Sequence, residues 1–94
     1  MGSSFFSSDD FERRGFELYS KGSFEAALTV FRKGVLQFPA VPDLYEGLGS
    51  CYLELGEYVL AARYFERGLV YSPDHVGMLA GLGQAYVMLG YPLA

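Results

Sequence analysis

The chain has 94 residues, 51% of them hydrophobic and 17% aromatic, which is enough apolar surface for one small folded domain. Its formal net charge of −4 at pH 7 argues against binding to nucleic acid or to an anionic membrane surface, both of which attract basic proteins. The chain contains no run of about 18 apolar residues that could span a bilayer.

The single cysteine and the N-terminal residues bear on the compartment of the protein. Cys51 has no second cysteine with which to form a disulfide inside the chain, and this fits a reducing compartment. Residues 1–8 lack the basic start and the long apolar stretch of a secretory signal. We therefore expect a cytoplasmic protein.

The spacing of apolar residues predicts five helices and no strand. Residues 1–7 are expected to form a flexible tail, after which Ser7 or Ser8 caps the first helix and Gly22 ends it. Proline and glycine separate the helices, and Asp74 is a candidate N-cap for the fifth. The other four helices are predicted at about residues 24–37, 44–55, 57–71 and 76–89.

From Gly15 onward, the sequence repeats itself every 34 residues. Glycine recurs at positions 15, 49 and 83, and again at 22, 56 and 90. Other residues that recur one period apart are Leu48/Leu82, Tyr52/Tyr86, Phe24/Tyr58, Ala27/Ala61, Phe31/Phe65, Gly34/Gly68 and Pro39/Pro73. A fixed period of this length indicates a stack of small units, none of which can bury its apolar face alone.

Small residues recur at three positions of the unit, where we expect paired helices to approach most closely. Glycine inside a helix costs about 1 kcal/mol relative to alanine, so repeated glycines make sense only if close packing offsets that cost. The small residues concerned are Gly15, Ala27, Gly34, Gly49, Ala61, Gly68 and Gly83.

The second unit resembles the tetratricopeptide repeat, a helix–turn–helix unit of 34 residues. Pro42 is taken as its first residue, and the first unit departs from the pattern where Arg14 replaces leucine. The signature residues of the second unit are Tyr45, Leu48, Gly49, Tyr52, Gly56, Tyr58, Ala61, Phe65, Gly68 and Pro73.

The resemblance implies the fold and the organisation of the chain. We expect an all-α array of five helices in antiparallel pairs, stacked as a right-handed superhelix (an α-solenoid). The resemblance covers residues 8–94 as one domain. Its repeats are expected at residues 8–41 and 42–75, with a partial repeat at 76–94.

No catalytic or metal-binding arrangement is apparent in the sequence. Cys51 and His75 are expected on a helix face and in a loop nearly one repeat apart, which does not suit a nucleophilic pair. His75 and Asp74 lack further ligands at the spacing that a metal requires. The Gly-Leu-Gly segment at 47–49 is not a phosphate loop, because it lies within a helix and no Lys-Ser/Thr follows it. We therefore expect a protein that is not an enzyme and requires no cofactor or metal.

In tetratricopeptide arrays, one face of the first helix of each unit lines a concave groove that binds peptides or helices. By this resemblance, the chain is a non-catalytic protein-binding module whose groove combines an acidic patch with an apolar floor and suits a basic, amphipathic protein or peptide. The carboxylates also have a simpler interpretation, as charges that favour helix starts or face solvent. The predicted groove residues are Glu12, Phe16, Tyr19, Asp43, Glu46, Ser50, Leu53, Glu54, Gln84, Val87 and Met88.

One subclass of the family does not fit this chain. Tetratricopeptide domains that grip the C-terminal carboxylate of heat-shock chaperones place Lys, Asn and Arg at five groove positions. The residues of this chain at those positions are Glu12, Phe16, Gly47, Gly77 and Gly81. Because a cationic clamp binds an anion, an acidic groove predicts a partner of the opposite sign.

Two other roles remain open. In the first, the exposed end of the stack forms a homodimer or meets further repeats of a longer array, since repeat arrays need a polar cap. The expected self-association face consists of Leu79, Leu82, Tyr86 and Leu89. In the second, the chain acts as a chaperone, because small acidic arrays of this kind are similar in size, charge and fold to the tetratricopeptide chaperones of bacterial type III secretion.

Overall fold

The computed structural model describes residues 7–91 and shows five α-helices, with no strand in that range. Residues 1–6 of the expected tail and residues 92–94 of the expected domain lie outside the described residues. The helices are α1 (Ser8–Ser20), α2 (Phe24–Gln37), α3 (Pro42–Glu54), α4 (Tyr58–Tyr71) and α5 (Val76–Leu89). For the described part of the chain, the predicted number and order of helices are confirmed.

The start of α3 differs most from the prediction. This helix begins at Pro42 instead of Leu44, because proline suits the first turn, where its fixed φ is helical and its missing N–H would have no partner. Tyr45 anchors the start, since its hydroxyl donates a hydrogen bond to the backbone oxygen of Pro39 at 2.6 Å. Asp43 therefore lies in the first turn of α3 and not in the preceding loop.

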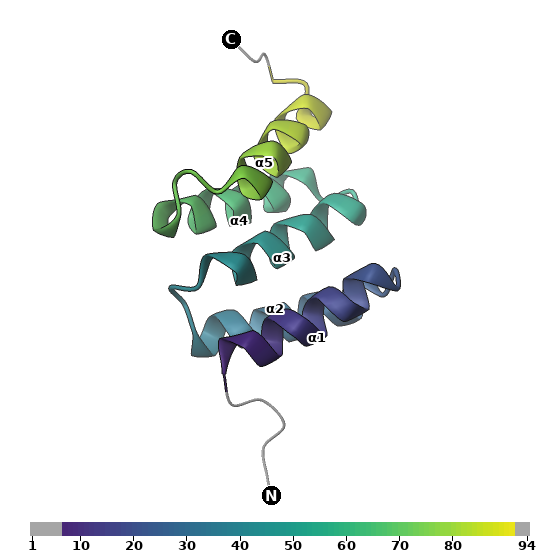
Figure 1. The fold of residues 1–94 in the computed structure, drawn as a ribbon. Coiled ribbons are helices and arrows are strands. Elements are labelled where there is room, and N and C mark those ends of the chain that lie inside the picture. The colour runs from purple at the N-terminus through teal and green to yellow at the C-terminus, as the bar shows by residue number, and fades with distance from the viewer. Residues whose placement is uncertain (1–6, 92–94) are drawn as a thin grey trace, which may run out of the picture.

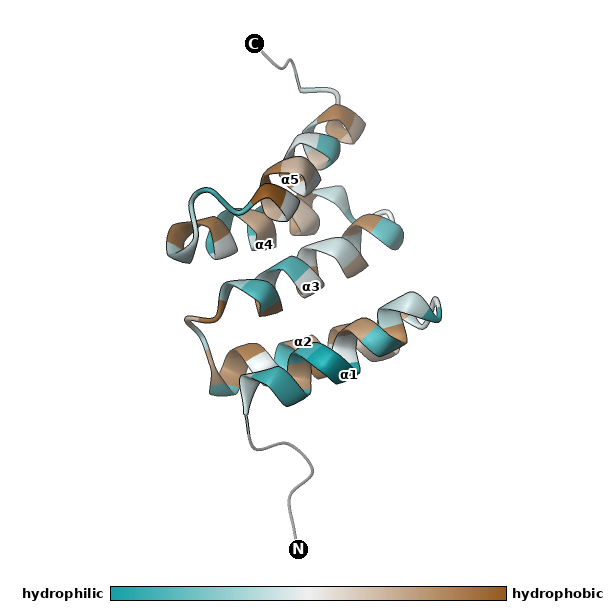
Figure 2. Cartoon of the chain, viewed as in Figure 1, coloured by the Kyte–Doolittle hydropathy of each residue, from teal (hydrophilic) through white to brown (hydrophobic). Residues whose placement is uncertain are grey.

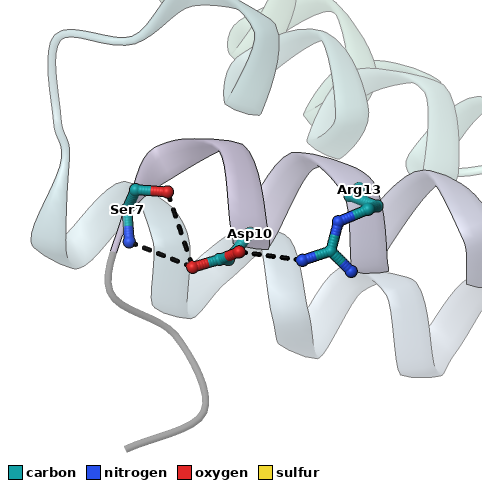
Figure 3. Close-up of polar contacts among 3 residues, drawn as sticks. All are labelled: Ser7, Asp10 and Arg13. Carbon is teal, nitrogen blue, oxygen red and sulfur yellow. Dashed lines mark hydrogen bonds and ion pairs between the residues drawn. The ribbon is translucent and has the colours of Figure 1, made fainter.

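A capping box begins α1 (Figure 3). The backbone N–H of Ser7 donates to Oδ2 of Asp10 at 3.3 Å, and the Ser7 hydroxyl lies 3.5 Å from the same oxygen. The other carboxylate oxygen of Asp10 pairs with Nη2 of Arg13 at 2.8 Å. Of the two predicted caps, Ser7 and Ser8, the structure has Ser7 at the N-cap, and the box satisfies polar groups that the first turn of a helix leaves without a partner.

The helices form antiparallel pairs that stack along one direction (Figure 1). Each helix packs on the next one in the chain, and α3 also packs on both α1 and α5. We call these three the inner helices, and α2 and α4 the outer helices. The outer helices both pack on α3 but not directly on each other. The predicted all-α array of helix pairs is confirmed.

Glycine ends each of the inner helices. Gly22, Gly56 and Gly90 follow α1, α3 and α5, with φ angles of 80°, 79° and 80°. This left-handed conformation is strained for residues that carry a Cβ atom, and glycine adopts it readily. The predicted helix ends at these three positions are therefore confirmed.

Phenylalanines of the outer helices fill the space between inner helices. Phe31 of α2 is fully buried between Gly15 of α1 and Gly47 of α3. A Cβ atom on either glycine would overlap its ring, so both inner helices approach the ring closely. The sequence pattern identified Gly15 as a contact position but did not identify Gly47.

The same arrangement recurs one repeat later. Phe65 of α4 lies between Gly49 of α3 and Gly81 of α5, and a Cβ atom on either glycine would lie 2.5 Å from its ring. The predicted close contacts at Gly15 and Gly49 are confirmed. The corresponding contact expected at Gly83 is absent from the described part of the chain, because nothing lies within 4 Å of a Cβ atom built there.

Hydropathy changes along the stack (Figure 2). The helix α1 is mainly hydrophilic, whereas α5 is mainly hydrophobic and carries no Asp, Glu, Lys or Arg between Val76 and Leu89. None of the helices in the described residues is long and apolar enough to cross a membrane. The two ends of the stack therefore differ in chemical character.

Candidate functional site

The predicted groove residues lie on the three inner helices. Because these helices pack on one another, equivalent positions on them lie on a common surface, which we call the inner face. Its half-buried members are Glu12, Phe16, Tyr19, Asp43, Glu46, Ser50 and Leu53, and its exposed members are Glu54, Gln84, Val87 and Met88. Two groups of these residues lie close together in the structure, an acidic group and a group around Tyr19.

Glu12, Asp43 and Glu46 form an acidic cluster across α1 and α3. Burial, followed by the negative charges of Asp43 and Asp9 and a hydrogen bond with Asp43, raises the pKa of Glu12 above its ordinary value. Burial also raises the pKa of Glu46, while the nearby His75 opposes this rise. In the described part of the chain, no lysine or arginine pairs with any of the three carboxylates. The cluster therefore concentrates negative charge that no Lys or Arg of the fold neutralises.

His75 is the N-cap of α5 and links that helix to the acidic cluster. Its Nδ1 accepts a hydrogen bond from the backbone N–H of Met78 at 3.1 Å. Its Nε2 lies 3.0 Å from Oδ1 of Asp43 and 3.6 Å from Oε1 of Glu46. The prediction that Asp74 caps this helix is wrong, because the side chain of His75 makes the capping bond.

Asp43, Glu46 and His75 also offer three possible metal ligands, whose atoms lie within 4.8 Å of one another. The sequence alone had indicated no further ligands near His75. The tautomer of the histidine opposes metal binding: a backbone N–H donates to Nδ1, so the proton of the neutral ring is on Nε2, the atom that faces the carboxylates. A metal ion would have to displace that proton and the capping bond together. The three side chains therefore act as a helix cap and a polar link between α3 and α5.

Gly77 makes room for this link. A Cβ atom at this position would overlap Oε2 of Glu46 and would lie 3.2 Å from Cε1 of His75. Glycine in the first turn of α5 therefore lets the helix approach the acidic cluster closely. The sequence pattern placed Gly77 on the inner face without revealing this role, and a glycine in a first helical turn is the signal that could have found it.

Tyr19 and Glu54 link α1 to α3 near the C-terminal ends of both helices. The Tyr19 hydroxyl donates a hydrogen bond to Oε2 of Glu54 at 3.2 Å. Burial, together with the charge of Glu54, raises the pKa of Tyr19 to about 12. The ring of Tyr19 packs edge-on against Phe24 with centroids 5.3 Å apart. Phe16 packs in the same way against Phe31, at 4.9 Å, so half-buried aromatic rings form the apolar part of the inner face along α1.

The family model of the tetratricopeptide repeat matches residues 13–73. The chain belongs to the tetratricopeptide repeat family. Among solved structures, it is similar to the second tetratricopeptide domain of Spaghetti (RPAP3), which is bound to an HSP90 peptide of sequence SRMEEVD. The two have a TM-score of 0.86 and 20% sequence identity over 88% of this chain and 77% of that chain, which shows a shared fold. No curated protein sequence matches the chain.

The single cysteine and the single histidine of the chain, Cys51 and His75, are both held within the packed fold. Cys51 is fully buried in α3, and burial raises the pKa of its thiol to about 12, which opposes formation of the reactive thiolate. His75 caps α5 and faces Asp43. The family to which the chain belongs supports a role as a protein-interaction module.

The described part of the tetratricopeptide array ends in an apolar helix. In the predicted self-association face, Leu79 is 47% exposed, whereas Leu82, Tyr86 and Leu89 are half-buried. Leu82 and Tyr86 pack against the core, and the Tyr86 hydroxyl donates a hydrogen bond to the Glu66 carboxylate of α4. Exposed apolar side chains outside the predicted face are Val76, Val87, Met88 and Tyr91. The apolar surface at this end is therefore broader than predicted, and Leu79 is its most exposed predicted member.

Proposed function

We propose that the chain is a non-catalytic adapter that binds a basic, amphipathic peptide or helix on its inner face. The acidic cluster carries this proposal, because Glu12, Asp43 and Glu46 are half-buried and have no lysine or arginine partner in the described part of the chain. A lysine or arginine of the partner would supply the missing counter-charge, at a site where partial burial reduces screening by salt.

The charges of the chain are divided between its inner and outer helices. Seven of its eleven acidic residues lie on α1 and α3: Asp9, Asp10, Glu12, Glu17, Asp43, Glu46 and Glu54. Four of its seven Lys and Arg residues lie on the outer helices: Arg32, Lys33, Arg63 and Arg67. This division favours a cationic partner on the inner side.

The inner face has the same sign of charge as the peptide bound in the similar solved structure. The peptide SRMEEVD carries three acidic side chains and one arginine. Such a peptide would be repelled by Glu12 and Glu46 on the inner face, since like charges brought together cost free energy. We therefore infer that this chain selects a ligand of opposite charge.

Apolar side chains supply the second part of the proposed binding surface. Phe16, Tyr19 and Leu53 are half-buried and packed on the core, so they offer rigid contacts that lose little entropy on binding. Val87 and Met88 on α5 are 57% and 52% exposed, which leaves much of their area free for a partner. An amphipathic partner would cover these groups with its apolar side while its basic residues meet the acidic cluster.

Fluorescence anisotropy with a labelled amphipathic peptide of Lys and Leu tests this proposal. A peptide of the same design with Glu in place of Lys should not bind the inner face, so its binding should not be weakened by changes to the inner-face glutamates. The triple variant Glu12→Gln/Glu46→Gln/Glu54→Gln should weaken binding of the Lys peptide by about tenfold at low salt, mainly through slower association. Replacing Tyr19 and Leu53 by alanine should instead speed dissociation, because apolar contacts hold the bound state together.

A matched triple variant controls for net charge. Glu17→Gln/Glu25→Gln/Glu57→Gln removes the same charge from exposed positions outside the acidic cluster and should change binding by less than about twofold. Equal losses in the two triple variants would mean that net charge alone attracts the peptide, and would contradict the inner face as the site.

A second candidate function is assembly through α5. Among the described residues, nothing lies within 4 Å of a Cβ atom built at Gly83, whereas the equivalent glycines Gly15 and Gly49 each contact a buried phenylalanine ring, and this difference favours assembly. Leu79 is exposed beside Gly83, and α5 has no charged residue that would oppose burial. A helix from a second copy or from a further repeat would bury this strip, as stacking does elsewhere in repeat arrays.

Light scattering over a range of concentrations tests the assembly. A self-associating chain should exceed its monomer mass of 10.4 kDa as concentration rises. Leu79→Lys should return it to monomer, whereas Val59→Lys, at a 51% exposed position on α4, should not. A monomer at every concentration would contradict pairing between copies.

A further inference from the structure

A hollow of about 280 Å³ opens between the outer helices, on the side of the array away from the inner face. It is lined by Arg32, Val35, Leu36, Leu48, Tyr64 and Arg67. Because α2 and α4 do not pack directly on each other, space remains between them. Leu48 of α3, which is only 1% exposed, forms the floor of the hollow. The hollow therefore combines apolar walls with two guanidinium groups.

The two arginines of the hollow are not paired with carboxylates. In the described part of the chain, two arginines of α1 form ion pairs, but Arg32 and Arg67 pair with no Asp or Glu. Instead, Arg32 lies over the ring of Tyr52 at 5.8 Å, and Arg67 lies over Tyr64 at 5.2 Å. Arg32 also donates a hydrogen bond to the Tyr52 hydroxyl. A guanidinium has five N–H donors, so both arginines, held in place by tyrosines, keep donors for an anion.

A second hollow of about 270 Å³ adjoins the first at Arg67. Its other lining residues are Tyr45, Val70 and Tyr71. Leu36 in the first hollow is 84% exposed, and Val70 in the second is 75% exposed, although both are large apolar side chains. They are one repeat apart in the sequence, so each outer helix presents an apolar side chain at the same place. Exposed apolar groups beside unpaired cations are typical of an interaction surface.

We propose that these two hollows, the outer site, bind an acidic peptide segment that carries apolar side chains. Carboxylates of the segment pair with Arg32 and Arg67, and its apolar side chains cover Leu36 and Val70. Charge complementarity favours this partner, because the outer helices carry four basic residues and only two acidic ones, Glu25 and Glu66. The outer site is independent of the proposed inner-face function, and with both sites the protein holds a basic and an acidic segment at once.

Fluorescence anisotropy with an acidic probe tests the outer site. The probe is a labelled peptide in which a Leu-Phe pair is flanked by three glutamates on each side, and its counterpart has lysines in place of the glutamates. Arg32→Gln/Arg67→Gln should weaken binding of the acidic probe by about tenfold, with a smaller salt dependence than the original chain shows. Leu36→Ala should weaken it several-fold at low and at high salt, because it removes an apolar contact.

A matched double variant tests whether the outer site binds the probe or whether the overall charge of the protein attracts it. Arg14→Gln/Lys21→Gln removes the same two positive charges from α1 and the residue after it, and should change binding by less than about twofold. Arg32 also contacts Tyr52, so the double variant could lose stability. If it unfolds, the single variants Arg67→Gln and Leu36→Ala provide the test. Equal weakening by the two double variants, or equal weakening of the acidic and basic probes by Arg32→Gln/Arg67→Gln, would overturn the proposal.

The variants of each surface distinguish this proposal from that for the inner face. Glu12→Gln/Glu46→Gln should not weaken binding of the acidic probe, and Arg32→Gln/Arg67→Gln should not weaken binding of the Lys-Leu peptide. Weaker binding of the acidic probe to Glu12→Gln/Glu46→Gln would place both ligands on one surface and overturn the outer site. A failure of the Lys-Leu peptide to bind at all would contradict the inner-face proposal and leave the result for the outer site unaffected.

Discussion

The ring of Phe65 occupies the space that a side chain on Gly49 would need. A Cβ atom on Gly49 would lie 2.5 Å from Cε1 of Phe65 and 2.7 Å from Cδ1, closer than non-bonded carbon atoms approach. Gly83 has the same place in the next repeat, yet among residues 7–91 nothing lies within 4 Å of a Cβ atom built there. One residue type therefore permits close packing in one repeat and borders open space in the next.

This difference predicts opposite effects of the same substitution. Gly49→Ala should lower the free energy of unfolding by about 1–3 kcal/mol, because overpacking against Phe65 outweighs the gain in helix propensity. Gly83→Ala should raise it by about 0.5–1 kcal/mol, because alanine favours the helix and meets no neighbour. Urea denaturation measures both differences, and a stabilised Gly49→Ala variant would show that the ring is not packed there.

Capping of α5 by His75 predicts a second pair of results. His75→Ala should lower the free energy of unfolding by about 1 kcal/mol, because it removes the hydrogen bond to the N–H of Met78. Asp74→Ala should change it by less than about 0.5 kcal/mol, since that side chain is exposed and does not cap the helix. Thermal or urea denaturation compares the two variants, and a larger loss for Asp74→Ala would restore Asp74 as the cap.

The acidic cluster predicts how stability depends on pH. The pKa of Glu12 is raised above its ordinary value of 4.5, mainly by burial and then by Asp43 and Asp9. Between these two pKa values the folded chain binds more protons than the unfolded chain, so the contribution of Glu12 to stability falls as pH rises through this window. Glu12→Gln should therefore raise the melting temperature at neutral pH, and this gain should vanish well below pH 4.5.

Glu25→Gln provides the control for this pH dependence. Glu25 is exposed on α2, outside the acidic cluster, so its replacement should leave the melting temperature nearly unchanged at both pH values. A neutral-pH gain of equal size in the two variants would trace the effect to net charge and not to the cluster.

Burial of Cys51 predicts slow reaction with thiol reagents. The pKa of its thiol is raised to about 12 by burial, and the side chain has no exposed area in the folded chain. Labelling with a chromogenic disulfide reagent should therefore require local opening of the fold and should become fast in urea. Because Cys51 is the single cysteine, the absorbance change reports this site alone. Complete labelling of the folded protein within the mixing time would contradict its burial in α3.

The helices of this protein were predictable from the sequence because their signals act locally. The glycines at 22, 56 and 90 end the inner helices through their own φ angles, and the 34-residue period sets the register of the units. The positions that make up the inner face could be assigned for the same reason, since residue positions within a helix define its faces, and their role in binding stays a prediction. The close packing at Gly15 and Gly49 followed from the repeat.

The contacts that form the candidate sites depend on which helices are neighbours in space. His75 meets Asp43 across 32 residues only because α5 packs on α3, and the side chain of His75, not that of Asp74, caps α5. Gly47 and Gly81 contact phenylalanine rings because each ring lies between two inner helices. Residue types and their period determine where helices begin, end and show an apolar face. Which charges pair, which side chains are buried and which surfaces stay open depend on the distances between helices. Those distances are set only when the helices stack.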